Sequence, residues 1–205
     1  MGRNCGWLTA YSAKVYREWL DSQKWVPSLG LDRKHWEIHG IYVPEMHMDI
    51  EAEGRRLRHI MDRDGNVNIF LSEGAGVMDI VAEMEAAGQT VNRDAFGHVR
   101  LDEINPGQYF AKRFAQLLDA EKVLVQKSGY FARSAASNFA DLHLIKGVAD
   151  MAVECAFAGK SGVIGHDEEN HDVLSCIDFP RIKGGKPFDT TQGWFQEMLS
   201  EIGQA

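Results

Sequence analysis

Short β-prone runs alternate with longer helix-like segments along this chain. Ile41–Val43 is a strand-like run closed by Pro44, and residues 50–62 follow with the spacing and charge pairs of an amphipathic helix. Val67–Leu71 is apolar at nearly every position, as a strand covered on both faces should be, and a helix-like run to Ala87 comes after it. This alternation predicts an α/β fold in three layers, with a mostly parallel sheet and helices on both faces.

Further elements are expected on either side of these two strand-helix units. An amphipathic helix should run from Leu8 to near Asp21, and residues 22–40 are interpreted as a connecting insertion that contains a helical turn. The remaining elements are a helix that opens at Pro106, a strand at Lys122–Val125, a long helix from Ala135 that stops at Gly159, and strands at Val163–Ile164 and Val173–Phe179. No repeat or clear linker divides the chain, so we expect residues 1–205 to belong to one domain.

Charge and cysteine content exclude several classes of protein. A formal charge of -8 and a pI near 5.5, with basic residues spread among acids, argue against a nucleic-acid surface. Cys5, Cys155 and Cys176 form no CxxC pair, which favours a reducing compartment. No apolar stretch approaches the roughly 18 residues of a membrane span. We therefore expect a soluble, cytoplasmic protein with no membrane partner.

The turn Ser72-Glu73-Gly74, just after the second predicted strand, places a carboxylate where parallel sheets bind ligands. In such sheets the ligands gather beyond the carboxyl ends of the strands. Glu73 could therefore hydrogen-bond the hydroxyl groups of a sugar. The alternative is that Glu73 lies in the first turn of the next helix, where the helix dipole favours an acid.

A second candidate site lies before the long predicted helix, where Lys127, Tyr130 and Arg133 cluster. The first N–H groups of a helix have no partner within it and attract anions such as phosphate. Arg133 would add a bidentate guanidinium contact and Tyr130 a hydroxyl donor, unless Arg133 pairs with a nearby acid instead. Met1-Gly2-Arg3, just ahead of the first helix, is a weaker candidate of the same kind.

Two other groups of residues are better explained without a ligand. A metal cluster is suggested by composition alone for His35, Glu37, His39, Glu45 and His47. Histidines four residues apart are a weak signal without a demonstrated helix, and surface histidines are commoner, so we expect no metal ligands in this chain. The run Lys183-Gly184-Gly185-Lys186-Pro187 could approach a phosphate through its glycine backbone, but a solvent-exposed loop is the simpler interpretation.

Three of these motifs, taken in order, resemble the motif set of the phosphofructokinases. They are Met1-Gly2-Arg3, Ser72-Glu73-Gly74 and Tyr130-Phe131-Ala132-Arg133-Ser134-Ala135. The Tyr-x-x-Arg form and the tail from Asp178 to Asp189 are similar to the pyrophosphate-dependent branch of the family. The resemblance runs from the first residue to about Gln204 and corresponds to the carboxyl-terminal half of a family member. It implies a phosphofructokinase-like, partial version of the predicted fold.

The resemblance also implies a role for each motif. Met1, Gly2 and Arg3 would contact the sugar and the phosphoryl group in transfer, Glu73 would bind fructose hydroxyls, and Tyr130 with Arg133 would bind the 6-phosphate. The family reaction is Mg²⁺-dependent transfer of a phosphoryl group from pyrophosphate to the 1-hydroxyl of fructose 6-phosphate, a glycolytic step. The implied substrates are therefore fructose 6-phosphate and, in the full-length enzyme, pyrophosphate. A complete member is expected to be a homo-oligomer.

Two family motifs have no counterpart in this sequence. The aspartate base of the family lies in Thr-Ile-Asp, and its phosphoryl donor binds at Gly-Gly-Asp; neither motif occurs here, nor do the acids that hold Mg²⁺. We therefore expect a truncated chain without the donor-binding half, inactive alone, with an incompletely covered core. Two alternatives remain open, namely a fragment of an ATP-dependent phosphofructokinase and a non-catalytic sugar-phosphate-binding module.

Overall fold

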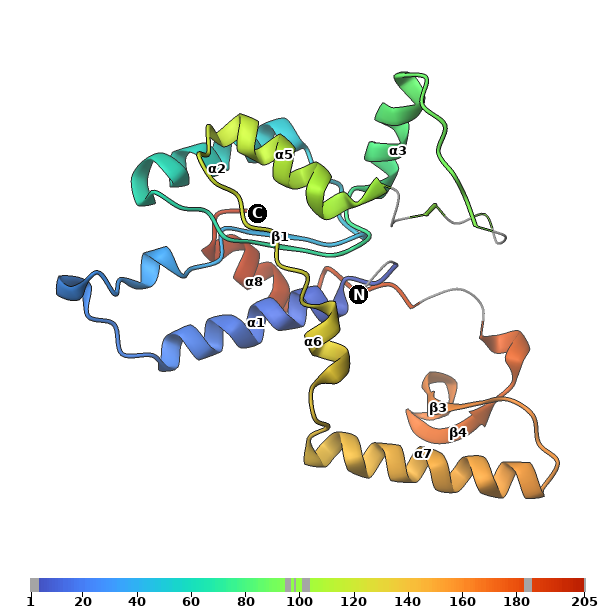
Figure 1. Ribbon diagram of the computed structural model, residues 1–205. Coiled ribbons are helices and arrows are strands. Elements are labelled where there is room, and N and C mark those ends of the chain that lie inside the picture. Colours follow the sequence, from blue (N-terminus) through green and yellow to red (C-terminus); the bar gives the residue numbers. More distant parts are fainter. Residues whose placement is uncertain (1–3, 95–96, 98, 101–103, 183–185, 205) are drawn as a thin grey trace. The chain divides into compact units, whose positions relative to one another are not determined.

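The computed structural model divides the chain into two compact units (Figure 1). It describes residues 4–94, 97, 99–100, 104–182 and 186–204. Unit 1 comprises Met1–Gln126 and Lys186–Ala205, and unit 2 comprises Lys127–Gly185. The chain therefore passes from unit 1 to unit 2 after Gln126 and returns after Gly185.

Unit 1 is built on two short parallel strands. β1 (Gly40–Tyr42) and β2 (Ile69–Leu71) pair in register, with Ile41 opposite Phe70. α2 (Ile50–Asp64) connects them, as a parallel pair requires. The predicted strand-helix-strand unit is thus confirmed, and the structure is a mixed α/β fold with a small parallel sheet.

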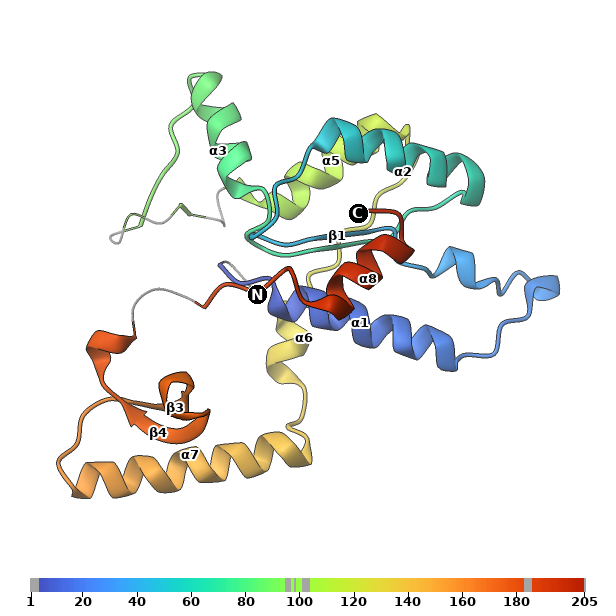
Figure 2. The same cartoon turned by 180° about the vertical axis from the view of Figure 1, so that it is seen from behind.

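Helices cover both faces of this sheet (Figure 1 and Figure 2). On one face, α1 (Trp7–Ser22) and α8 (Gly193–Glu201) pack around Ile41 and Phe70. On the other, α2, α3 (Val77–Ala86) and α5 (Pro106–Leu118) pack around Tyr42 and Leu71. Successive strand residues point to opposite faces, so each strand contributes to both apolar clusters.

The boundaries of α2 show why the sequence forms a helix there. The side chain of Asp49 accepts hydrogen bonds from the backbone N–H groups of Glu51 and Ala52, at 3.1 and 2.9 Å. Gly65, in the left-handed conformation at φ 75°, ends the helix. Gly54 lets α5 approach closely, because a Cβ at this position would lie 2.7 Å from Cδ1 of Leu117.

The segment predicted to be an insertion holds two short 3-10 turns, at Pro27–Leu29 and Arg33–His35. Ion pairs attach it to α1: Glu37 pairs with Arg17 at 3.0 Å, and Arg33 pairs with Asp21. Charged contacts therefore hold the segment against α1. Whether it is an insertion relative to other proteins stays a prediction.

Unit 2 consists of α6 (Gly129–Ser134), α7 (Phe139–Phe157) and a β-hairpin. β3 (Val163–Asp167) and β4 (Val173–Ile177) are antiparallel, with Gly165 opposite Ser175, and α7 packs against this hairpin. Short 3-10 turns lie at Glu168–Asn170 and Phe179–Arg181.

The structure corrects two predictions about the sheet. The strands at 163–167 and 173–177 form a hairpin of their own, whereas the sequence predicted a mostly parallel sheet. Lys122–Val125 is not a strand, and Leu124 is 81% exposed. A β-prone run forms a strand only beside a partner strand, and among the described residues none pairs with this one.

Large apolar side chains of α7 remain exposed, although the helix packs against the hairpin. No described residue of α7 is buried, and Phe139 and Phe157 are 87% and 91% exposed. Within the described ranges, no helix combines the length and apolar character that crossing a membrane would require.

Candidate functional site

Glu73 lies just beyond the carboxyl end of β2, where the sequence placed it. It is an exposed residue in the turn that joins β2 to α3. The backbone of this turn continues the strand pairing, because Ser72 N–H donates to the carbonyl of Tyr42 at 2.8 Å. The location of Glu73 therefore agrees with the prediction, and its role in binding a sugar stays a prediction.

Two small residues shape the turn around Glu73. The fully buried Ser72 accepts a hydrogen bond from the N–H of Ala75 at 3.1 Å. Gly76 has a φ of 62°, and a Cβ there would lie 2.5 Å from Cζ of Phe110 on α5. Only glycine fits both this backbone and this contact, so α5 directly fixes where the turn ends.

Glu45 lies at the same edge of the sheet, three residues beyond β1. Its carboxylate accepts the backbone N–H of Gly6 at 2.9 and 3.1 Å and that of Phe188 at 2.8 Å. Sequence reasoning considered Glu45 only as a disfavoured metal ligand. The signal that could have identified it is position alone, because Glu45, like Glu73, follows a strand of a parallel pair.

The other members of the suggested metal cluster serve the fold. His39 is buried, and its Nδ1 accepts the N–H of Asn68 at 3.1 Å. Burial lowers the pKa of His39, so the neutral ring that accepts this bond is favoured. Glu37 is held by Arg17 and Arg33. Among the described residues, no group of three or more His, Cys, Asp or Glu could hold a metal ion.

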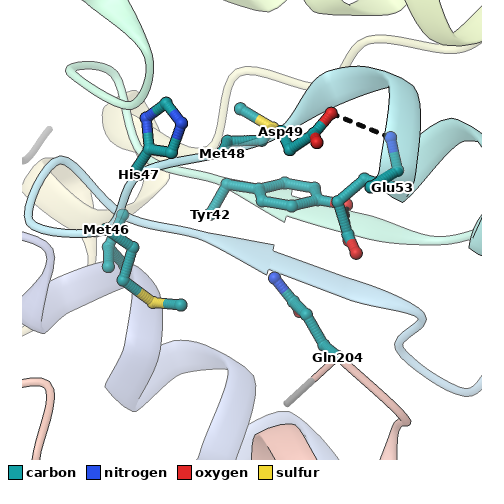
Figure 3. Close-up of a pocket in the computed structure, with 9 residues that line it drawn as sticks. Tyr42, Met46, His47, Met48, Asp49, Glu53 and Gln204 are labelled. Carbon is teal, nitrogen blue, oxygen red and sulfur yellow. Dashed lines mark hydrogen bonds between the residues drawn. The ribbon is translucent and has the colours of Figure 1, made fainter.

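A small cavity of about 140 Å³ lies between β1, the start of α2 and Gln204 (Figure 3). The polar groups that line it bind other protein groups. Gln204 exchanges two hydrogen bonds with the backbone of Ile41, at 2.7 and 2.8 Å, and Tyr42 donates to Glu53 at 2.5 Å. Burial and this carboxylate raise the pKa of Tyr42. The cavity therefore has a structural explanation, and Glu73 is not part of its lining.

Tyr130 and Arg133 lie in α6 of unit 2, and their side chains are outside the described residues. The sequence placed them between a strand and the N-terminus of the long helix. They do precede the long helix, but the described residues 119–128 just before them form no strand, and α6 is a separate helix that ends where Ala135 takes an extended backbone, with ψ 143°. The long helix begins only at Phe139.

The start of α7 is capped by its own side chains. Asn138 accepts the N–H of Asp141 at 2.9 Å, and the Asp141 carboxylate accepts the N–H of Asn138 at 3.3 Å. This reciprocal pair is a capping box. It places an acid in the first turn of α7, and the anion site predicted at Lys127, Tyr130 and Arg133, which precede this helix, stays a prediction.

Two of the three cysteines are neighbours in unit 2, although they lie far apart in the sequence. Burial raises the pKa of the Cys176 thiol, and a hydrogen bond with Cys155 raises it further. Both thiols are free, and both side chains are half-buried. A raised pKa favours the thiol form of Cys176 over the reactive thiolate.

The candidate site residues are thus divided between the two units. Glu73 belongs to unit 1, and Tyr130 and Arg133 belong to unit 2. Met1, Gly2 and Arg3 lie outside the described residues. Gly6 donates a hydrogen bond to Glu45. The structure therefore describes the surroundings of Glu73, and the convergence of the six motif residues stays a prediction.

Curated proteins named pyrophosphate–fructose 6-phosphate 1-phosphotransferase are similar to this chain throughout its length. The chain is 63% identical over 204 residues to the protein of Methylomonas methanica and 62% over 205 residues to that of Methylotuvimicrobium alcaliphilum. A more distant relative, from Mastigamoeba balamuthi, is 57% identical over 204 residues. Each match covers 100% of this chain and 50% of the relative.

Comparisons with family models and with solved structures found no match. The chain spans about half the length of the curated relatives it matches. An identity near 60% averaged over the whole 205-residue chain is nonetheless far more than three short motifs could produce. The chain is therefore similar, over its whole length, to about half of a pyrophosphate–fructose 6-phosphate 1-phosphotransferase.

Proposed function

We propose that this chain binds fructose 6-phosphate for phosphoryl transfer from pyrophosphate to the 1-hydroxyl of the sugar. The observation that carries the proposal is the identity of 57–63% to enzymes with that name. The same names favour pyrophosphate over ATP as the donor. We also propose that the complete protein acts in glycolysis in the cytoplasm and assembles into a homo-oligomer.

The proposed roles follow from the chemistry of each side chain. The Glu73 carboxylate accepts hydrogen bonds from sugar hydroxyls, which fixes the orientation of the acceptor. Arg133 binds the 6-phosphate through its guanidinium fork, and the Tyr130 hydroxyl adds a donor. Arg3 stabilises charge on the phosphoryl group as it moves. Catalysis of this type depends mostly on positioning and charge stabilisation.

A phosphofructokinase-like, three-layer arrangement is the fold that we propose for the whole protein. It is supported in unit 1 by a parallel strand pair with helices on both faces and by an acid beyond the end of each strand. Glu73 lies beyond the carboxyl end of β2, where ligand-binding residues of parallel sheets are found.

Mg²⁺ is implied by the family, and the described residues of this chain do not fit it. They bring together no group of acids or histidines that could hold the ion, and the 205 residues contain neither Thr-Ile-Asp nor Gly-Gly-Asp. We therefore derive no step through the metal. We expect the isolated chain to form no fructose 1,6-bisphosphate in a coupled assay, and turnover by this chain alone would contradict that expectation.

Calorimetry with three ligands tests the proposed function. The wild-type chain should bind fructose 6-phosphate more tightly than either fructose or inorganic phosphate, because the site recognises both ends of the ligand. Arg133→Met should weaken binding of fructose 6-phosphate roughly 10- to 100-fold and leave fructose unaffected. Glu73→Gln should weaken binding of both sugars. Arg58→Met, at a partly exposed arginine paired with Asp62, is the matched control.

The outcomes separate the candidate functions. Binding of fructose 6-phosphate without turnover fits both the proposed function and a non-catalytic sugar-phosphate-binding module. Turnover with pyrophosphate by a protein that joins this chain to the other half of a relative would favour the enzyme. Absence of any fructose 6-phosphate binding to the folded wild-type chain would contradict both.

A further inference from the structure

The turn that carries Glu73 is attached to the rest of unit 1 at both of its ends. At its start, the buried Ser72 donates its N–H to the carbonyl of Tyr42 on β1 at 2.8 Å. At its end, Gly76 precedes α3, and its carbonyl accepts the N–H of Ile80 at 3.0 Å. Within residues 72–76, all of which the structure describes, only Glu73 is exposed. The backbone is therefore held on both sides of one exposed carboxylate.

The ring of Phe110, on α5, fills the space beside Gly76. A Cβ on Gly76 would lie 2.5 Å from Cζ and 3.1 Å from Cε2 of this ring. Phe110 is only 4% exposed, so the ring itself has little room to move. The end of the Glu73 turn therefore cannot shift toward α5 without displacing a buried aromatic ring.

Neighbouring aromatic rings fix the position of Phe110. Tyr109 meets it edge-on with centroids 5.2 Å apart, and the centroid of Phe114 lies 6.2 Å from it. Phe114 in turn stacks on Tyr42, with centroids 5.8 Å apart and an interplanar angle of 21°. Both ends of the turn are thus connected to Tyr42, the start by a hydrogen bond and the end, at Gly76, through two rings.

We propose that Phe110 is a positioning residue for Glu73, because its ring fixes where the turn ends and so where the carboxylate meets the sugar hydroxyls. The proposal rests on the proposed function, since the place of Glu73 matters only if Glu73 binds the sugar. Phe110 acts on the substrate only through Gly76 and Glu73. A carboxylate on a fixed turn needs less ordering when the sugar binds, so the affinity depends on this buried ring.

Fructose 6-phosphate affinity, measured by calorimetry on the whole chain, tests the proposal. Phe110→Leu removes the edge of the ring beside Gly76 and should weaken binding roughly tenfold. Phe195→Leu is the matched control, because it makes the same change at a fully buried phenylalanine in the cluster on the opposite face of the sheet. It should reduce stability in the same way but leave the affinity unchanged.

A substitution on the other side of the contact supplies a rescue experiment. Gly76→Ala should weaken binding, because the new Cβ meets the Phe110 ring and displaces the turn. In a Phe110→Leu background the smaller side chain leaves room for that Cβ, so Gly76→Ala should cost less affinity there than in the wild type. A general loss of packing would make the two losses add, and additive losses would overturn the proposal.

A second double variant tests whether Phe110 acts through the carboxylate. In a Glu73→Ala background, Phe110→Leu should cause no further loss of fructose 6-phosphate affinity. The proposal is wrong if folded Phe110→Leu binds as tightly as the wild type, or if Phe195→Leu weakens binding to the same extent. If Phe110→Leu does not fold, Phe110→Met takes its place in each comparison.

Hydrogen exchange of the ligand-free chain shows whether the turn itself has loosened. Phe110→Leu should increase exchange at the amides of Ala75 and Ile80, which are bonded within the turn and at the start of α3, and Phe195→Leu should not. Unchanged exchange in Phe110→Leu would also overturn the proposal.

The binding results separate failure of this inference from failure of the proposed function. If the wild-type chain binds no fructose 6-phosphate, or if Glu73→Ala binds it as tightly as the wild type, the proposed function or the proposed role of Glu73 fails and the inference fails with it. If Glu73→Ala weakens binding and Phe110→Leu does not, only the inference fails.

Discussion

Arg181 holds the carboxylate of Asp167 through two parallel hydrogen bonds. Nη1 donates to Oδ2 at 2.8 Å and Nη2 donates to Oδ1 at 2.6 Å. Asp167 is the last residue of β3, and Arg181 lies in the 3-10 turn that follows β4. The pair therefore ties the hairpin of unit 2 to the segment that leads back to unit 1. The Arg181 guanidinium lowers the pKa of Asp167.

Asp167→Asn should make unit 2 less stable than in the wild type at neutral pH, and this difference should shrink in acid. The folded pKa of Asp167 is below its ordinary value of 3.8, so the contribution of the pair is complete above about pH 4. It is lost as the pH falls through the folded pKa. Urea unfolding followed by circular dichroism should show the wild type and the variant differing at pH 7 and converging in acid. Glu169→Gln, which removes a 77% exposed partner of Arg181, should change little. A difference that does not depend on pH would contradict the account.

Unit 1 should lose stability as the pH falls from 7.5 to 5.5 because of His39. Burial lowers its folded pKa below the ordinary 6.5, so the unfolded chain takes up a proton first. Protonation would also place an N–H on Nδ1, opposite the N–H of Asn68. The slope contributed by one proton is at most about 1.4 kcal/mol per pH unit.

Tryptophan fluorescence can measure this effect, because all five tryptophans lie in unit 1. His39→Asn should flatten the pH dependence of the urea midpoint, since an amide oxygen accepts the Asn68 N–H at any pH in this range. His59→Asn, on the exposed surface of α2, is the control and should not flatten it. Equal slopes in wild type and His39→Asn would show that another group is responsible.

Asn138→Ala should destabilise unit 2 by about 1 kcal/mol, because it removes the side chain that caps α7. Asn138→Asp keeps an acceptor and should retain most of the stability. Far-ultraviolet circular dichroism during urea unfolding measures the loss. An unchanged midpoint in Asn138→Ala would mean that the capping box does not determine where α7 begins.

Hydrophobic periodicity predicted the unit 1 helices closely. The expected helix from Leu8 to Asp21 is α1, and the expected segment over residues 50–62 is α2. These predictions succeed because each helix carries its own signals, such as the Asp49 cap and the Gly65 stop. Local sequence contains those signals, so no knowledge of neighbouring elements is needed.

Which strands pair, and which elements pack against each helix, could not be predicted in this way. Lys122–Val125 has strong β propensity but no partner strand among the described residues. The apolar residues of α7 recur with helical periodicity. Periodicity identifies an apolar face of a helix but does not show which residues pack against it. The break between α6 and α7 depends on the backbone at Ala135, which no apolar pattern marks.

The position of Glu73 was predictable because it depends only on the order of elements along the chain. Glu73 follows β2, and that position could be inferred from a strand-turn-helix pattern. The role of Glu45 could not, because it depends on Gly6 and Phe188, which meet only in the folded chain. Contacts at such separations are set by tertiary packing, and a single sequence carries little trace of them.

The crystal structure of the chain with fructose 6-phosphate bound tests the central claim most directly. The measurement is the distance from the Glu73 carboxylate to the sugar hydroxyls and from the Arg133 guanidinium to the 6-phosphate of the same molecule. We predict that both are within hydrogen-bonding distance. A sugar phosphate held by residues of one unit alone, with Arg133 paired to an acid elsewhere, would contradict the assignment.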